Sequence, residues 1–99
     1  MYSTRIIALA ELEIVAVLSQ MGSEFTSHDF LNAFSAQHPE KYEAIVRSYV
    51  NQRTDYRHAK QRAHVMLMHT VNDRFHRFAY KIETIPNPNG GEMSLWRRG

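Results

Sequence analysis

The chain has 99 residues, of which 43% are hydrophobic, and this is enough to close one hydrophobic core without disulfides or a metal. It contains no cysteine, which excludes disulfides and thiolate metal sites. Glu11 and Glu13 interrupt the apolar N-terminal run before it reaches the ~18 residues that a membrane span needs. The run also lacks the pattern of an export signal. We therefore expect a single domain over residues 1–99, located in the cytoplasm and not in a membrane.

The net charge is only +2, but the charges are distributed unevenly along the chain. Residues 1–52 carry three Lys and Arg against six Asp and Glu, a balance of −3. Residues 53–99 carry nine against four, a balance of +5. This asymmetry favours a polyanionic partner for the second half. The alternative is a surface of mixed charge whose charged residues are unevenly distributed along the chain by chance.

Hydrophobic periodicity predicts a first helix over residues 4–21. This helix is apolar over so much of its circumference that it should be central to the core. Gly22 is expected to end it, because glycine is the usual residue just beyond a helix C-terminus.

The start signal of the second helix is a capping box. Thr26 can cap a helix over residues 27–37, while Asp29 can reach back to the Thr26 backbone N–H. Phe25 and Phe30 occupy the two positions of a hydrophobic staple, so both are expected to be buried.

A third helix is predicted over residues 39–51, because Pro39 suits a first helical turn, where its missing N–H would be unpaired anyway. A fourth helix is predicted over residues 55–76, with Thr54 as its cap. The apolar stripe of the third helix is Tyr42, Ile45, Val46, Tyr49 and Val50. The inward face of the fourth is Tyr56, Ala59, Ala63, Leu67 and Val71. Its outward face is Arg57, His58, Gln61, Val65, Met68 and Asn72.

The period changes from helical to alternating at about Phe78, which predicts a hairpin over residues 78–98. Phe78, Tyr80 and Ile82 form the apolar side of its first strand. A turn rich in Pro, Asn and Gly follows at residues 86–91. Trp96 in the return strand is expected to pack the hairpin onto the helices.

Helices followed by a C-terminal hairpin resemble the winged helix-turn-helix group of DNA-binding domains. The resemblance is carried by residues 25–34, the helix that starts at Asp55 and the hairpin at 78–98. It implies a mainly α domain with a small β-hairpin (α+β), and double-stranded DNA as the partner. In this group the recognition helix directly follows the second helix, whereas here residues 42–50 intervene. Either these residues are an insertion and the helix from Asp55 reads DNA, or they take that place themselves; the charges favour the helix from Asp55.

Recognition helices present their N-terminal turns to base edges, where Arg pairs with guanine and Gln with adenine. The candidate base contacts are Arg57, Gln61 and His64, and the candidate phosphate contacts are His58, Lys60 and Arg62. As a wing, the hairpin would add salt-dependent affinity through Lys81, Arg97 and Arg98. Its tip carries no Lys or Arg, however, so a purely stabilising hairpin is nearly as well supported.

We find no pattern that predicts catalysis, a cofactor or a metal. The histidines lack the spacing of metal ligands, and neither a nucleophile elbow nor a phosphate loop is present. The prediction is therefore a small transcriptional regulator or mobile-element accessory factor that binds DNA as a dimer over two half-sites. The alternative is a protein-interaction module or inhibitor on the same scaffold. The apolar residues that support the alternative are Tyr2, Ile6, Leu9, Val65 and Met68.

Overall fold

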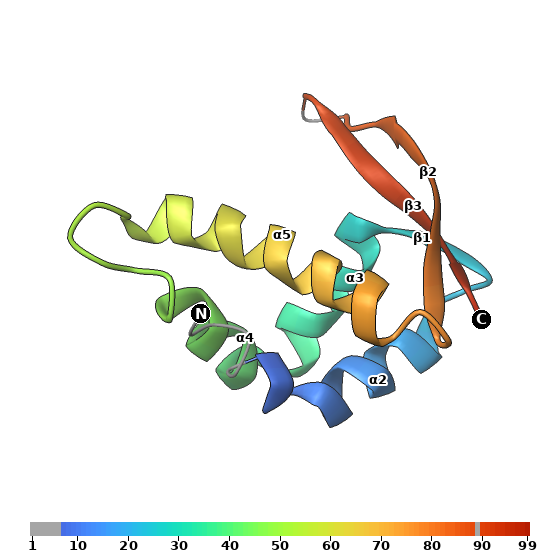
Figure 1. Cartoon of the computed structure of the whole chain (residues 1–99), viewed down its shortest axis with the longest axis horizontal. Coiled ribbons are helices and arrows are strands. Elements are labelled where there is room, and N and C mark those ends of the chain that lie inside the picture. Colours follow the sequence, from blue (N-terminus) through green and yellow to red (C-terminus); the bar gives the residue numbers. More distant parts are fainter. Residues whose placement is uncertain (1–6, 89) are drawn as a thin grey trace.

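A computed structural model describes residues 7–88 and 90–99, and it shows a mixed α+β domain in which helices partly cover a small antiparallel sheet (Figure 1). The arrangement is compatible with a winged helix. The elements are α2 (Glu11–Gln20), β1 (Glu24–Thr26), α3 (Ser27–Gln37), α4 (Pro39–Arg47), α5 (Tyr56–Arg74), β2 (Ala79–Pro86) and β3 (Glu92–Arg98).

The sheet has the strand order β1-β3-β2, so β3 lies between its two partners. The predicted hairpin is present as β2 and β3, but β1 was not predicted. Phe25 of β1 pairs with Trp96 of β3, and their rings stack at 6.5 Å between centroids. A three-residue strand is too short to show an alternating pattern, and the staple interpretation already accounted for the burial of Phe25.

The capping box of α3 is confirmed in full. The Thr26 hydroxyl accepts from the Asp29 N–H at 3.1 Å, and the Asp29 carboxylate accepts from the Thr26 N–H at 2.9 Å. Phe25 and Phe30 are both buried, as the staple predicts. This part of the chain could be predicted because both interactions are local in the sequence.

The first and third helices were predicted too long. Residues 4–6 lie outside the described residues, and a turn at Leu9 and Ala10 interrupts the helical backbone before α2 begins. The helix α2 ends at Gln20, and its C-cap is Met21 in an extended conformation (ψ 153°). Gly22 does not have a positive φ, so it does not end the helix in the way that we predicted. The third helix ends at Arg47 rather than at residue 51.

The fourth helix is α5, and its cap is Asp55 rather than Thr54. The predicted inward residues Ala59, Ala63, Leu67 and Val71 are buried. Tyr56, in contrast, is 40% exposed, and its hydroxyl donates to Glu43 at 2.7 Å. The first helical turn therefore projects beyond the core that the rest of α5 covers.

The predicted faces of the first hairpin strand are confirmed only in part. Ala79 is buried while Phe78 and Tyr80 are exposed, which reverses the prediction at the start of the strand. Ile82, in contrast, is half-buried between the exposed Lys81 and Glu83, as predicted. A register shift between Lys81 and Glu83 marks a β-bulge, which is how a strand redirects its side chains.

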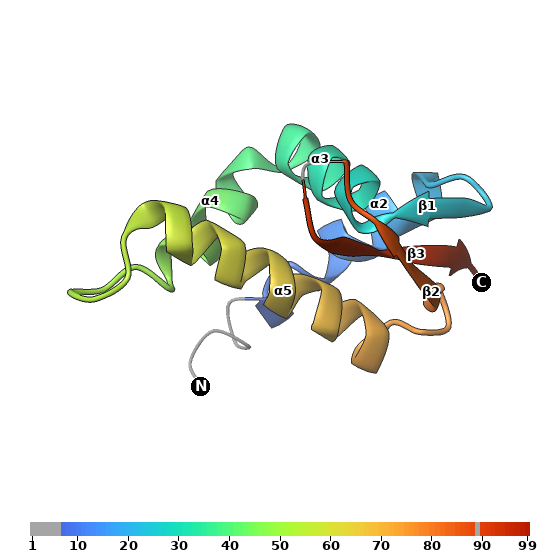
Figure 2. The ribbon, with the colours of Figure 1, turned by 90° about the horizontal axis from the view of Figure 1, so that it is seen from above.

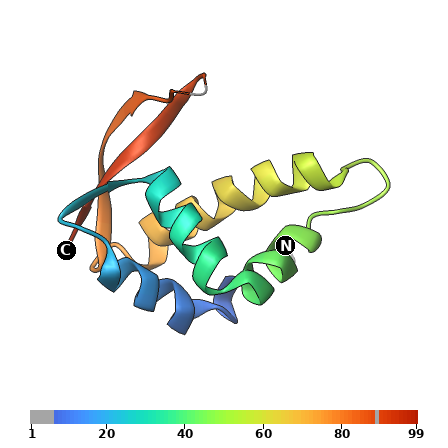
Figure 3. The ribbon, with the colours of Figure 1, turned by 180° about the vertical axis from the view of Figure 1, so that it is seen from behind.

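Trp96 joins the sheet to the helical layer, as predicted. It is 2% exposed, and its indole N–H donates to the Ser27 hydroxyl at 3.0 Å. Seen from above, β3 lies between α3 and the C-terminal part of α5, and the hairpin tip lies beside α3 (Figure 2). From behind, α3 crosses in front of α5, and α2 lies along the opposite side from the hairpin tip (Figure 3).

Candidate nucleic-acid interface

The candidate interface begins at the N-terminus of α5, which Asp55 caps. The Asp55 carboxylate accepts from the His58 backbone N–H at 2.9 Å and lies 2.8 Å from His58 Nδ1. These hydrogen bonds from the His58 backbone and ring lower the pKa of the Asp55 carboxyl, so it is ionised at neutral pH. His58, predicted as a phosphate contact, is thus held by the cap.

Three exposed cations follow on the first two turns of α5, namely Arg57, Lys60 and Arg62. Arg53 is also exposed, on the loop that leads into the helix. Among residues 7–88 and 90–99, none of these four side chains lies within 4.0 Å of a carboxylate oxygen. We call these four residues the cationic end.

Arg47, in contrast to these four residues, has an anionic partner within the protein. Its Nε lies 2.7 Å from the Glu43 carboxylate, and its guanidinium lies 5.7 Å from the centre of the Tyr56 ring. The cationic end makes no carboxylate contact this short within the described chain, although the charge of Arg57 also lowers the pKa of the neighbouring Asp55 carboxyl. Its side chains are therefore accessible to an external anion.

Gln61 lies between Lys60 and Arg62, with each cation about 100° to one side around the helix axis. Its side chain is exposed, and it also lines a groove that continues along α5. Arg62 instead borders a smaller hollow formed with the loop between α4 and α5. In such an arrangement the central amide can contact a base edge while the two cations contact phosphates of the two DNA strands.

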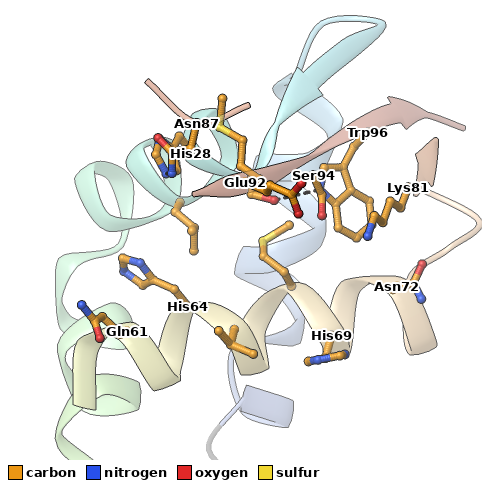
Figure 4. A pocket seen from close by; sticks show the side chains of 15 residues that line it. His28, Gln61, His64, His69, Asn72, Lys81, Asn87, Glu92, Ser94 and Trp96 are labelled. Carbon is orange, nitrogen blue, oxygen red and sulfur yellow. Dashed lines mark hydrogen bonds between the residues drawn. The ribbon is translucent and has the colours of Figure 1, made fainter. Parts of the chain in front are cut away.

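The groove lies between α3, α5 and the hairpin and has a volume of about 570 Å³ (Figure 4). We call it the α5 groove. Its polar wall on α5 is Gln61, His64, His69 and Asn72, and its apolar surface includes Leu31, Val65, Met68 and Met93. The hairpin adds Lys81, Asn87, Glu92, Ser94 and Trp96, and α3 adds Ser27 and His28.

His64, predicted as a base contact, is half-buried and already bonded within the protein. Its Nε2 lies 2.7 Å from the Tyr42 hydroxyl. Burial, then the charge of Lys60 and then His28 lower the pKa of His64. Burial also raises the pKa of Tyr42 to about 12, with smaller contributions from Tyr56 and Glu43. The tyrosine therefore stays protonated and the imidazole is neutral at neutral pH, so a hydrogen bond between two neutral groups joins α4 to α5 here.

The hairpin cations do not join the cationic end. Arg97 pairs with the Glu24 carboxylate at 2.9 Å, and Arg98 donates to the Ser19 carbonyl oxygen at 2.9 Å. Lys81 lines the α5 groove beside Asn72, at the end away from Gln61 (Figure 4). The structure therefore brings together Arg57, Lys60, Gln61 and Arg62 of the predicted set, and leaves the hairpin residues apart from them.

The hairpin tip is tied to α3 by Asn87, whose side-chain amide lies 3.3 Å from His28 Nε2. Sequence reasoning did not predict the groove, because its walls come together only when the hairpin returns over α3. In the sequence, the outward-facing apolar residues Val65 and Met68 of the predicted helix were the features from which the groove could have been found.

No helix of the described chain has the length and apolarity to cross a membrane. The same residues contain no cluster of three or more His, Asp or Glu side chains placed to hold a metal ion. Comparisons with protein-family models, curated proteins and solved structures found no match to this chain.

Proposed function

We propose that this chain binds duplex DNA, with the N-terminal half of α5 entering the major groove. The observation that carries the proposal is the cationic end, of which Arg57, Lys60 and Arg62 are exposed around Gln61 with no carboxylate oxygen within 4.0 Å in the described chain. The proposed regulator or accessory role follows from this binding.

The shape of the domain supports the same assignment. The N-terminal end of α5 and the loop before it project away from the sheet (Figures 1 and 3). A single helix fits the major groove, which is about 12 Å wide, provided that neighbouring elements do not crowd it. Gln61 would face base edges, and Lys60 and Arg62 would contact phosphates on the two sides of the groove.

The hairpin has a smaller role in this proposal than the sequence implied. Arg97 and Arg98 already have partners in Glu24 and the Ser19 carbonyl, so a DNA contact would have to displace them. We expect the hairpin to position α5 and add little direct affinity. A dimer would place two α5 helices over two half-sites.

The test is fluorescence anisotropy of a labelled random duplex at several salt concentrations. We expect Lys60→Ala combined with Arg62→Ala to weaken binding on the order of 50-fold near 0.1 M salt, because two phosphate contacts are lost. The slope of log affinity against log salt should become shallower by about 1.8.

The matched control is Arg74→Ala combined with Arg77→Ala, which removes the same charge from two exposed positions, one in the last turn of α5 and one in the turn that follows it. We expect a change below about threefold, since distant surface charges are screened. An equal loss in both double variants would show that net charge, rather than the cationic end, drives binding. A folded protein that does not bind the duplex at low salt would exclude the proposal.

A protein-interaction role is the second candidate, and a different surface favours it. Leu12 is 81% exposed on α2, and Leu9 is 67% exposed in the turn before it. Tyr2 and Ile6, which the sequence grouped with Leu9, lie outside the described residues. Binding through such apolar side chains would change little with salt, whereas phosphate binding weakens steeply between ~50 and ~200 mM.

A further inference from the structure

The α5 groove has the dimensions of a site for a small organic molecule. Its wall on α5 runs from Gln61 to Asn72, which is eleven helical steps and therefore about 16 Å along the helix axis. Its volume of about 570 Å³ lies within the range of roughly 300–1,000 Å³ that is usual for ligand sites. An elongated ligand therefore fits it better than a compact one.

The middle of the groove is apolar. Val65 is 55% exposed there, and the half-buried Met68 and Met93 approach it from α5 and from β3. Methionine side chains are flexible and polarizable, so they adapt to the shape of an apolar ligand. Their presence on two facing elements favours a hydrocarbon body that lies between the helix and the hairpin.

One end of the groove carries a cation. Lys81 and Asn72 lie together at one end (Figure 4), and within the described residues no carboxylate lies within 4.0 Å of the Lys81 ammonium. Glu92 is the carboxylate among the described lining residues. In the hairpin register Lys81 is opposite Trp96 while Glu92 is opposite Pro86, which places them about 13 Å apart along β3.

We infer that the α5 groove binds an organic carboxylate with an extended apolar body. The carboxylate pairs with Lys81 and accepts from the Asn72 amide, and the hydrocarbon lies along Val65, Met68 and Met93. Glu92 repels the carboxylate from the rest of the groove and so fixes the direction of the ligand. A chain of roughly ten to twelve carbons spans the available length.

This site is separate from the cationic end, and the inference does not depend on DNA binding. Arg57 and Arg62 do not supply its charge, because they do not line the groove. A titration of the free chain without DNA therefore tests it independently of the proposed function.

The experiment is isothermal titration of the folded chain with decanoate, decanol and decylammonium, each below its micelle concentration. We expect decanoate to bind saturably and about tenfold or more tighter than either comparator, because only it forms a charge-assisted pair with Lys81. NMR shifts should appear at the methyl groups of Met68 and Met93.

Variants separate the head group from the apolar body. Lys81→Met should weaken decanoate about tenfold, and Lys81→Glu should reverse the preference toward decylammonium. Met68→Trp should weaken all three probes by filling the groove. Arg77→Met, an exposed cation outside the groove, should leave decanoate binding unchanged. Each variant is first shown to unfold cooperatively in urea.

Three outcomes would overturn the inference. One is no saturable decanoate binding to the folded wild-type chain. Another is equal affinity for decanoate and decylammonium, which would show that Lys81 does not recognise the head group. The third is wild-type affinity in Lys81→Met, which would place the carboxylate elsewhere.

Discussion

The two halves of α5 share one helical pattern but differ in what surrounds them. The N-terminal half buries only the small side chains of Ala59 and Ala63, and it carries the cationic end outward. The C-terminal half buries the larger Leu67 and Val71, and the hairpin and α3 enclose its outward side as a groove. One element therefore offers an open charged surface and a partly enclosed apolar one.

The comparison shows that the side chains that stabilise the fold and the exposed cations lie in different halves of α5. Large buried side chains contribute most of the hydrophobic free energy, and in α5 they lie toward the sheet. Unpaired surface cations contribute little to folding, so they can be present for binding without a structural role. Changes at the two ends should therefore affect different measurements.

The largest effect should come from Trp96→Ala, which removes the side chain that joins the sheet to α3. We expect the free energy of unfolding to fall by about 3–5 kcal/mol, because an almost fully buried aromatic ring is lost. Arg57→Ala should change it by less than about 0.5 kcal/mol. Urea denaturation followed by circular dichroism measures both. Similar losses of unfolding free energy in the two variants would contradict the conclusion that the exposed cations contribute little to folding.

A smaller effect should come from Asp55→Ala, which removes the cap of the N-terminal half. We expect a loss of about 1 kcal/mol, as is usual for an Asp cap. Hydrogen exchange should accelerate at the first turns of α5 and stay nearly unchanged near Leu67 and Val71. Asp55→Asn is the control, because Asn keeps the acceptor for the His58 N–H. Uniform acceleration along α5 would show that its halves do not open separately.

The smallest effect should be the pH dependence that His64 adds at the boundary of the two halves. Its pKa in the folded state lies below its ordinary value of 6.5, so the unfolded chain binds the proton more readily. The resulting stability is present above pH 6.5 and is lost as the pH falls through the lower, folded-state pKa. His64→Gln should make the unfolding free energy depend less on pH in this window, as measured by urea titrations at each pH. A steeper dependence in the variant would refute the assignment.

The sequence predicted the features that depend on local interactions. The capping box of Thr26 and Asp29 and the buried stripe of α5 follow from residues close together in the chain or from a clear period. The early end of α4 was missed, because Ser48 and Asn51 form a turn through hydrogen bonds that compete with helix.

The candidate site was predicted only in part, because long-range contacts decide the rest. Arg57, Lys60, Gln61 and Arg62 are neighbours on one helix, so their grouping could be foreseen. The engagement of Arg97 by Glu24 depends on β1, a strand that has no sequence signal. The position of Lys81 depends on how the hairpin packs over α5 and on the register shift that follows Lys81, neither of which alternation predicts.

The central place of β3 has a consequence for how the chain folds during synthesis. β1 and β2 do not pair with each other, and both need a strand that is made after every other described element. Glu24 finds its partner Arg97 seventy-three residues later, so sheet formation closes a long loop and is slow compared with helix formation. Until β3 leaves the ribosome, the apolar faces that Trp96 covers stay uncovered, and the nascent chain depends on its helices for solubility.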